Sequence, residues 1–217
     1  MLEDLRANSW SLRPCCMVLA YRAAHFCSVW RKKNVLNNLW AAPLLVLYRI
    51  ITECFFGYEI QAAATIGRRF TIHHGYAVVI NKNVVAGDDF TIRHGVTIGN
   101  RGADNMACPH IGNGVELGAN VIILGDITLG NNVTVGAGSV VLKNLPANCT
   151  AVGVPAEVVR INNKAVNPAD DLDQQDLPDI MAQRLVDLDR RIGQLEKAAQ
   201  GDIPPTAQQV AARQRRH

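Results

Sequence analysis

The stretch IGNGVELGANVIILGDITLGNNVTVGAGSVV, residues 111–141, carries an aliphatic residue at every sixth position. An earlier run, from residue 60 to residue 96, keeps the same spacing with aliphatic or aromatic residues. Neither the helical period of 3.6 residues nor the strand period of 2 gives a step of six, so the pattern predicts a solenoid of hexapeptide repeats. The positions are Ile60, Ile66, Ile72, Val78, Val84, Phe90 and Val96, then Ile111, Leu117, Ile123, Leu129, Val135 and Val141.

The repeat predicts the fold of most of the chain. Each hexad forms a short strand and a turn, three hexads close one triangular coil, and the chain returns above itself after roughly 18 residues. We therefore expect an all-β solenoid, a left-handed parallel β-helix, over residues 58–160. Because such a solenoid is narrow and filled with side chains, its ligands must bind outside it, in grooves between subunits.

The repeat is interrupted once. Val96 and Ile111 are 15 residues apart where six would continue the pattern, so nine extra residues leave the solenoid within residues 99–110. Loops inserted into solenoids usually project from one face and often line the binding site. We expect this loop to take part in the site, and the alternative is a surface excursion without function.

The composition is typical of a soluble intracellular enzyme. The 217 residues include 48% hydrophobic residues and carry a formal net charge of +3. Basic residues cluster only at residues 31–33 and at the end of the chain, which gives a nucleic-acid surface little support. The six cysteines form no CxxC pair and no metal-ligand spacing, and the first residues lack the apolar segment of a signal peptide. We expect a cytoplasmic protein with free thiols and no metal.

Residues 1–57 are predicted to be helical. Residues 39–56 form a very apolar stretch that is almost long enough to span a bilayer, but Pro43, Arg49 and Glu53 interrupt it. We expect this helix to pack on the solenoid or on a neighbouring subunit, because charged residues are costly inside a membrane. Weak peripheral contact with the inner membrane is the alternative.

The C-terminal part of the chain is predicted to support assembly. Residues 161–179 are expected to form a polar linker, residues 180–200 a helix, and residues 201–217 a disordered tail. Two heptads are too short to form a stable helix alone, so we expect a homotrimer or a multiple of three. The apolar positions with coiled-coil spacing are Met181, Leu185, Leu188, Ile192 and Leu195.

Histidines are the most unusual polar residues of the repeats. His73 and His74 are adjacent, and His94 and His110 follow later. A neutral His is suited to take a proton from a hydroxyl near pH 7, and it needs a carboxylate to orient it. Glu59 lies 15 residues before His74, three short of a coil, so we expect the two side chains to meet near one vertex of adjacent coils. The alternative is that both are ordinary surface residues.

Residues 59–75, EIQAAATIGRRFTIHHG, resemble the serine acetyltransferase family of hexapeptide acyltransferases. The family motif has an acidic residue, Ile and His, then Ile-Gly, and ends in Asp-His-Gly or Asp-His-Ala. Residues 95–102, 135–142 and 152–156 also match the family. The resemblance implies an acetyl-CoA-dependent O-acetyltransferase in which His74 is the catalytic base and Glu59 orients it.

The same resemblance implies where the two substrates bind. Acetyl-CoA, as a co-substrate rather than a bound cofactor, would lie in a groove between two subunits. The residues implied for CoA are Gly99, Asn100, Arg101, Ala119 and Ala137. The residues implied for the acceptor are His73, Tyr76, Asn105, Cys108 and His110.

Two positions depart from the serine-specific pattern. The family's Asp beside the catalytic base, which helps to hold the amino group of serine, is His73, and the loop His that holds the carboxylate is Cys108. Losing a carboxylate opposite an ammonium removes a charge-assisted contact. Residues 1–142 are most similar to colanic acid biosynthesis acetyltransferases, so we expect a saccharide hydroxyl as acceptor. Residues 171–179 and the following helix resemble short bacterial serine acetyltransferases, which leaves serine as the alternative acceptor.

Two readings outside the acetyltransferases remain open at this point. Gamma-class carbonic anhydrases share the solenoid and bind zinc through three histidines. Here His73 and His74 are adjacent and point to opposite sides of a strand, which disfavours a zinc site. A purely structural solenoid is the other reading, and the Glu59/His74 pair together with the loop disfavours it.

Overall fold

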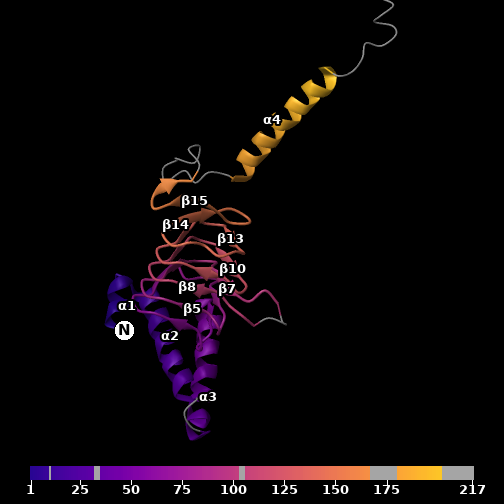
Figure 1. Ribbon diagram of the computed structural model, residues 1–217. Helices are drawn as coiled ribbons and strands as arrows, with labels where there is room; N and C mark the ends of the chain where they lie inside the picture. The colour runs from indigo at the N-terminus through magenta and orange to yellow at the C-terminus, as the bar shows by residue number, and fades with distance from the viewer. Residues whose placement is uncertain (10, 32–34, 103–105, 167–179, 202–217) are drawn as a thin grey trace, which may run out of the picture. The chain divides into compact units, whose positions relative to one another are not determined.

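Short strands from consecutive repeats stack as parallel neighbours into three sheets around one core in the computed structural model (Figure 1). The structure describes residues 1–9, 11–31, 35–102, 106–166 and 180–201. In the third sheet, two antiparallel strands follow the parallel ones. Sheet A joins β1 (Glu59–Ile60), β4 (Val79–Ile80), β7 (Thr97–Gly99), β10 (Ile122–Leu124) and β13 (Val140–Val141). Sheet B joins β2 (Thr65–Ile66), β5 (Val85–Ala86), β8 (His110–Ile111) and β11 (Thr128–Leu129). Sheet C joins β3 (Thr71–His73), β6 (Thr91–Arg93), β9 (Glu116–Leu117), β12 (Thr134–Val135), β14 (Cys149–Val152), β15 (Glu157–Ile161) and β16 (Lys164–Ala165). The predicted fold is confirmed as a parallel β-solenoid of about four turns.

Buried aliphatic residues from successive strands fill the solenoid. In sheet A, Ile60, Ile80 and Ile98 follow one another and are each at most 1% exposed. In the first two coils, the rings of Phe70 and Phe90 stack with their centroids 5.7 Å apart. Burying one such side chain contributes roughly 1.5–3 kcal/mol, so this stacked interior is the main source of stability.

The coils differ in length, which corrects the predicted spacing. Ile80 pairs with Ile98, the 18-residue step that the repeat predicts. However, Ile60 pairs with Ile80, a step of 20, and Ile98 pairs with Ile123, a step of 25. Two residues are therefore inserted between β3 and β4, and the later loop adds seven residues to its coil instead of the expected nine.

The two-residue insertion escaped the sequence pattern for a physical reason. Each hexad here buries two residues, one in the strand and one two positions earlier in the turn. Val78 and Ile80 are both fully buried, as are Val96 and Ile98. A step of six can therefore pass from strand positions to turn positions without meeting a polar residue, and the change of frame stays hidden.

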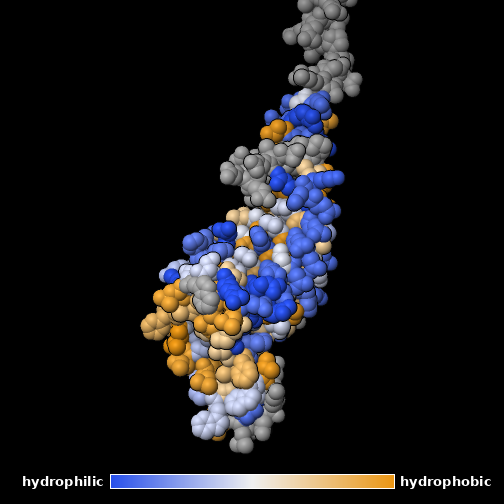
Figure 2. Space-filling model, turned by 90° about the vertical axis from the view of Figure 1, so that its left-hand side faces the viewer, coloured by the Kyte–Doolittle hydropathy of each residue, from blue (hydrophilic) through white to orange (hydrophobic). Residues whose placement is uncertain are grey.

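Three helices and a π-helix precede the first coil (Figure 1). They are α1 (Leu2–Ala7), α2 (Leu12–Arg31), α3 (Val35–Ile50) and η1 (Ile51–Phe56). Two tyrosines tie the helices to the solenoid, because Tyr21 Oη donates to the Ala64 carbonyl and Tyr48 Oη to the Ile60 carbonyl, each at 2.7 Å. Figure 2 shows that hydrophobic side chains gather on the surface over these helices.

A buried ion pair fixes the start of the chain to the first coil. Asp4 is 2% exposed, and its carboxylate accepts hydrogen bonds from Arg22 Nη2 at 3.0 Å and from the Phe70 N–H at 3.0 Å. Burial alone would raise the pKa of Asp4, but the hydrogen bonds from Arg22 and Phe70 and the charge of Arg22 hold it below its usual value. Arg22 Nη1 also donates to the Ile66 carbonyl at 2.6 Å, so α1, α2 and the solenoid share one network.

The C-terminal segments begin with a hairpin that the sequence reading assigned to a linker. β15 and β16 pair as antiparallel strands through Asn162 and Asn163, whose φ angles are +50° and +59°. Two asparagines with positive φ suit a tight two-residue turn, which explains their place in the sequence. The rest of the predicted linker, residues 167–179, and residues 202–217 of the predicted tail lie outside the described residues.

A second compact unit, residues 178–217, contains α4 (Ile180–Gly201). The predicted C-terminal helix is thus present, and its apolar stripe is unburied in the single chain. Leu185, Leu188, Ile192 and Leu195 are between 51% and 70% exposed. The side chain of Met181, the first residue of the stripe, lies outside the described part of the chain. A helix with this stripe requires a partner to bury it.

Candidate active site

The chain passes from sheet C to sheet A at one edge of the solenoid, which we call the C–A corner. It comprises residues 74–78, 94–96, 118–121 and 136–139. Backbone hydrogen bonds stack its coils: Gly95 N–H donates to Tyr76 O at 2.8 Å, Asn120 N–H to His94 O at 2.9 Å, and Gly138 N–H to Ala119 O at 2.8 Å. Residues far apart in the sequence therefore form one column, and it contains four of the predicted site residues, His74, Tyr76, Ala119 and Ala137.

The His73-His74-Gly75 motif forms the turn at the start of this column. His73 ends β3, and His74 follows with a left-handed backbone, φ +54°, with both side chains exposed. Gly75 is packed so closely under α2 that an added Cβ would lie 2.3 Å from Met17 Cε. The glycine therefore allows α2 to cover the turn while both imidazoles remain accessible.

His94 lies directly above His74 on the next coil. The register pairs His73 with Arg93, and the rings of His74 and His94 meet edge to face with centroids 6.3 Å apart. Sequence reasoning noticed His94 but gave it no role, because an 18-residue coil places residue 92 above His74. The 20-residue spacing of the two histidines was the available signal, and it becomes meaningful only once the longer coil is known.

A cavity of about 370 Å³ opens beside His74, between the turn from α1 to α2 and the end of β3. The guanidinium carbon of Arg13 lies 3.5 Å from the centroid of the Tyr76 ring, and Arg13 Nη2 donates to the Phe56 carbonyl at 3.1 Å. The lining residues are Ala7, Asn8, Ser9, Ser11, Arg13, Pro14, Ile72, His73, His74, Gly75 and Tyr76. The structure thus brings His73, His74 and Tyr76 together around a polar cavity that contains no acidic side chain.

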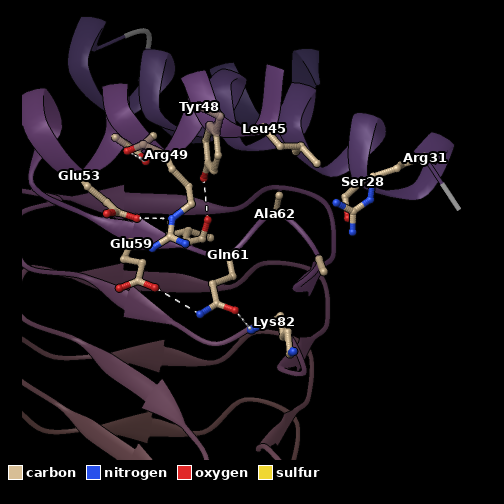
Figure 3. Close-up of a pocket in the computed structure, with 13 residues that line it drawn as sticks. Ser28, Arg31, Leu45, Tyr48, Arg49, Glu53, Glu59, Gln61, Ala62 and Lys82 are labelled. Atoms are coloured by element: carbon tan, nitrogen blue, oxygen red, sulfur yellow. Dashed lines mark hydrogen bonds and ion pairs between the residues drawn. The ribbon is translucent and has the colours of Figure 1, made fainter. Parts of the chain in front are cut away.

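Glu59 lies next to the same corner but faces another cavity. Its N–H donates to the Val78 carbonyl at 2.7 Å, and its carboxylate accepts from Gln61 Nε2 at 3.2 Å (Figure 3). Glu59 and His74 are both described, and neither a hydrogen bond nor an ion pair joins them. The expected contact between the two side chains is not formed in the single chain, so the orienting role of Glu59 stays a prediction.

The cavity that Glu59 lines lies beneath α3 and η1 and measures about 230 Å³ (Figure 3). Arg49 Nε donates to Glu53 Oε1 at 2.7 Å at its rim, and Gln61 Oε1 accepts from the Lys82 backbone N–H at 3.1 Å. Gln61 therefore links Glu59 to the next coil. In the chain without substrates, this network holds the carboxylate of Glu59 on the face of sheet A.

Three of the residues predicted to bind CoA, Gly99, Asn100 and Arg101, lie at or beside the other edge of sheet A. We call this edge the A–B corner, residues 81–84, 100–102, 106–109 and 125–127. Gly99 ends β7, and Asn100 Oδ1 accepts from Asn81 Nδ2 at 3.1 Å. Arg101 Nη2 donates to the Leu142 carbonyl at 2.7 Å, which holds the start of the loop along sheet A. Asn105, predicted to bind the acceptor, lies outside the described residues.

Cys108 and His110 follow the loop and lie apart from the cavity beside His74. Cys108 is 3% exposed within the core, and burial raises the pKa of its thiol. A buried thiol with a raised pKa is a poor nucleophile, and its position disfavours direct contact with an acceptor. His110 is exposed in β8, between Val85 and Thr128 of the neighbouring strands. Within one chain the predicted acceptor residues are therefore divided between two corners.

Known proteins with similar sequences and structures are acetyltransferases by name. Residues 108–143 match the family described as bacterial transferase hexapeptide (six repeats). WcaB of Escherichia coli K12, provisionally named a colanic acid biosynthesis acetyltransferase, is 93% identical over 158 residues, which are 73% of this chain and 98% of WcaB. The serine acetyltransferase of Bacillus pumilus is 39% identical over 184 residues, which are 83% of this chain and 82% of that protein.

Among solved structures, serine acetyltransferase of Brucella abortus strain S19 in complex with coenzyme A is similar to this chain. The two superpose with a TM-score of 0.60 at 31% sequence identity, over 68% of this chain and 56% of that one. This chain thus spans little more than half of that structure. The shared part has the hexapeptide solenoid fold described above.

Proposed function

The chain belongs to the hexapeptide-repeat acetyltransferases, and we propose that it acetylates a saccharide hydroxyl in exopolysaccharide synthesis of the colanic-acid type. It is an acetyl-CoA-dependent acyltransferase by its family and by the names of its relatives. The choice of acceptor class is supported by the 93% identity to nearly the whole of WcaB, because serine acetyltransferases reach only 39%.

The observation that carries the proposed site is the column at the C–A corner. Ala119 and Ala137 lie two and three coils from His74, roughly 10 and 14 Å away at the usual spacing of ~4.8 Å between strands. Gly118 has no room for a side chain, because an added Cβ would lie 2.6 Å from the Ala137 nitrogen. We propose that the extended pantetheine arm of acetyl-CoA lies along the small residues of this column.

The proposed reaction is direct transfer with His74 as general base. The acceptor oxygen attacks the thioester carbonyl carbon as the imidazole of His74 takes the hydroxyl proton. A carbon–oxygen bond forms, the carbon–sulfur bond breaks, and the CoA thiolate receives the proton from His74. Backbone N–H groups near the loop would stabilise the negative charge on the carbonyl oxygen during the attack. Glu59 would turn from Gln61 toward His74 when the substrates bind, since catalytic hydrogen bonds often tighten only in the complex.

We propose that the complete site forms between two copies of the chain. His74 and the column lie at the C–A corner, whereas Arg101 and His110 lie beyond the opposite edge of sheet A. One rigid solenoid cannot bring its two corners together, but a neighbouring copy can place its A–B corner against the column. A homotrimer closes such head-to-tail contacts into a ring, and the exposed stripe of α4 supplies a further contact.

The cavity beside His74 favours a neutral acceptor over serine. His73 and Tyr76 offer hydrogen bonds without requiring an ionised partner, as sugar hydroxyls do. The ammonium group of serine would find no carboxylate among the residues that line the cavity. Arg13 could pair with the carboxylate of serine, but its guanidinium is already stacked on Tyr76 and bonded to Phe56.

Serine O-acetyltransferase is the second candidate. The serine acetyltransferase of Bacillus pumilus matches 83% of this chain and WcaB matches 73%, so part of the chain has a counterpart in the former and none in the latter. The longer match to a serine acetyltransferase is the observation that favours this second candidate.

The test is to measure CoA release from acetyl-CoA with L-serine and with fucose-containing oligosaccharides, using His74→Ala as the blank. We expect saccharide-dependent release and little release with serine. The variant His73→Asp, which places a carboxylate among the residues that line the cavity, should gain serine activity. Robust serine turnover by the unmodified protein, with a Michaelis constant within ~1 µM–1 mM, would overturn the saccharide proposal in favour of the second candidate.

A further inference from the structure

The hairpin of α2 and α3 exposes a broad apolar surface (Figure 2). α3 buries only Ala41 and Tyr48 among its described side chains. The surface consists of Leu39, Trp40, Leu44 and Leu47 of α3 with Phe55 of η1, and we call it the α3 surface. These side chains are between 51% and 78% exposed, and Figure 2 shows the hydrophobic patch over this part of the molecule.

This surface gathers five large apolar side chains that are each more than half exposed. Exposed apolar patches beyond a few hundred Å² usually mark an interaction site. The stretch Asn37–Phe56 is long and apolar enough to cross a membrane by length and composition, and only 17% of it is buried in the protein. A core helix of a soluble protein would be mostly buried, so the stretch requires a cover.

The charges around the surface indicate the kind of cover. Residues 5–52 contain seven Arg and Lys residues and no Asp or Glu, although the whole chain carries only +3. Arg22 pairs with Asp4 and Arg49 with Glu53, whereas Arg31 is exposed at the end of α2. The basic run of residues 31–33 has no acidic neighbour in the sequence, and anionic lipid headgroups attract such a run.

Aromatic residues lie at the boundary between the basic and apolar parts. Trp30 precedes Arg31 at the end of α2 and is 38% exposed, and Trp40 in the first turns of α3 is 69% exposed. Tryptophan is enriched where a protein meets the interface between headgroups and hydrocarbon. A basic, aromatic and apolar helical surface is the combination found in helices that lie in the plane of a membrane.

We propose that the α3 surface docks on the interfacial region of an anionic lipid bilayer, with α2 and α3 lying on the membrane. α3 cannot cross the bilayer without leaving the solenoid, because Tyr48 is buried and its hydroxyl donates to the Ile60 carbonyl at 2.7 Å. A crossing would also place the pair of Arg49 and Glu53 inside the hydrocarbon.

A second copy of the chain would bind the α3 surface less favourably than an anionic bilayer would. A two-fold contact brings each patch against itself, so the basic residues of one copy would face those of the other. The like charges of residues 31–33 from the two copies would then repel one another. An anionic bilayer matches both the apolar and the basic part of the surface.

The inference stands on this surface alone and does not depend on the acceptor. Joined to the proposed function, it places the enzyme where a saccharide carried on a lipid is presented. Vesicle binding is measured without acetyl-CoA or acceptor, so a failure here is distinguishable from a failure of the proposed activity.

The experiment is flotation of the full-length protein with vesicles. One set contains phosphatidylethanolamine and phosphatidylglycerol, and the other contains phosphatidylcholine alone. We expect the protein to float with the anionic vesicles, with binding at least about ten-fold weaker to the neutral ones and weakened by salt. The variant Leu44→Gln with Leu47→Gln should lose at least about ten-fold in anionic binding. The matched control, Val154→Gln with Val166→Gln, changes two exposed apolar residues far along the chain and should float like the unmodified protein.

Four outcomes would overturn the proposal, and the last of them comes from an alkaline carbonate wash. The first is no flotation with the anionic vesicles, and the second is equal flotation of the Leu44/Leu47 variant and the unmodified protein. In the third, sedimentation shows that this variant breaks the assembly while its flotation is unchanged, which assigns the surface to a second copy. Release by an alkaline carbonate wash supports docking on the membrane, whereas retention of the protein would show a span and contradict it.

Discussion

Two edges of the same solenoid have similar backbone hydrogen bonds between their coils, but their side chains differ. At the edge between sheets B and C, which we call the B–C corner (residues 67–70, 87–90, 112–115 and 130–133), one contact repeats from coil to coil. The Arg68 N–H donates to Asp88 Oδ1, the Asp88 N–H to Asn113 Oδ1, and the Asn113 N–H to Asn131 Oδ1, each at 2.8 Å. A contact that repeats in this way holds successive coils together.

The C–A corner keeps the backbone ladder but varies its side chains. His74 and His94 occupy two coils, and Ala119 and Ala137 occupy the next two. The two-residue insertion lies at this corner and is absent from the B–C corner of the same coil. The corner that departs from the repeat is therefore the one at which we propose that the reaction takes place.

Replacing His74 at the C–A corner should have the largest effect of the changes considered. His74→Ala should lower turnover by ~10²–10⁴-fold, the usual contribution of a general base, because no other group takes the hydroxyl proton. The matched control Thr128→Ala alters an exposed residue of a regular coil and should leave turnover unchanged. Steady-state CoA release and thermal unfolding, measured on both variants, separate catalysis from folding. Near-normal turnover of folded His74→Ala protein would remove the proposed mechanism.

Asp4 caps the lower end of the B–C corner through Phe70, so its loss should reduce stability instead of activity. Asp4→Asn should cost about 3 kcal/mol in free energy of unfolding, because Arg22 is left without its partner. The folded-state pKa of Asp4 is lowered, so its contribution is complete above the unfolded value of about 3.9 and is lost as the pH falls through the lower folded value. Denaturant unfolding between neutral and acidic pH should show this loss in the unmodified protein and a smaller one in the variant. Equal pH dependence in both would contradict this assignment.

Removing one of the repeated hydrogen bonds at the B–C corner should cost less stability than the loss of Asp4. Asn113→Ala removes the acceptor of the Asp88 N–H, and the net cost of one hydrogen bond at an exposed site is about 1 kcal/mol. Turnover per folded molecule should stay unchanged, since this corner is far from the column. A loss of turnover at full stability would show that the B–C corner is more than scaffold.

Replacing His94 should lower turnover only slightly, and the result would show what His94 does at the C–A corner. Its edge-to-face contact with His74 is worth about 0.5–1.5 kcal/mol, so His94→Ala should lower turnover by roughly 2–10-fold. His94→Phe keeps an aromatic ring at the position and should restore most of the activity if His94 only positions His74. Equal loss in both variants would instead assign a role to the imidazole nitrogens of His94.

The repeat predicted the solenoid because one buried residue in six leaves a direct trace in the sequence. The same pattern could not reveal the insertion after His73, since Val78 and Ile80 are both buried and either continues the repeat. Because the predicted coil was two residues too short, His94 could not be placed above His74. The missed insertion therefore left the predicted fold correct but made the predicted arrangement of the site incomplete.

The contacts of individual side chains were harder to predict from the sequence than the fold was. Glu59 and His74 flank one corner, as their spacing suggested, but the Glu59 carboxylate accepts from Gln61, two residues along its own strand. Cys108 was expected near the acceptor, and its neighbours in the core bury it instead. Such choices depend on competing local partners, and the alignment of a motif with a family does not contain that information.

The central claim, that one copy supplies the C–A corner and the next supplies the loop, is tested most directly by mixed assemblies. One parent carries His74→Ala, and the other carries Asn100→Ala with Arg101→Ala. Each parent alone should be nearly inactive, and a loop variant with full activity would already contradict the role of the loop. Co-expressed in equal amounts, they should form some sites with an intact corner from one copy and an intact loop from the other. Random assembly gives about a quarter of normal activity. Activity no higher than that of the parents, in assemblies shown by two affinity tags to be mixed, would place the whole site within one chain.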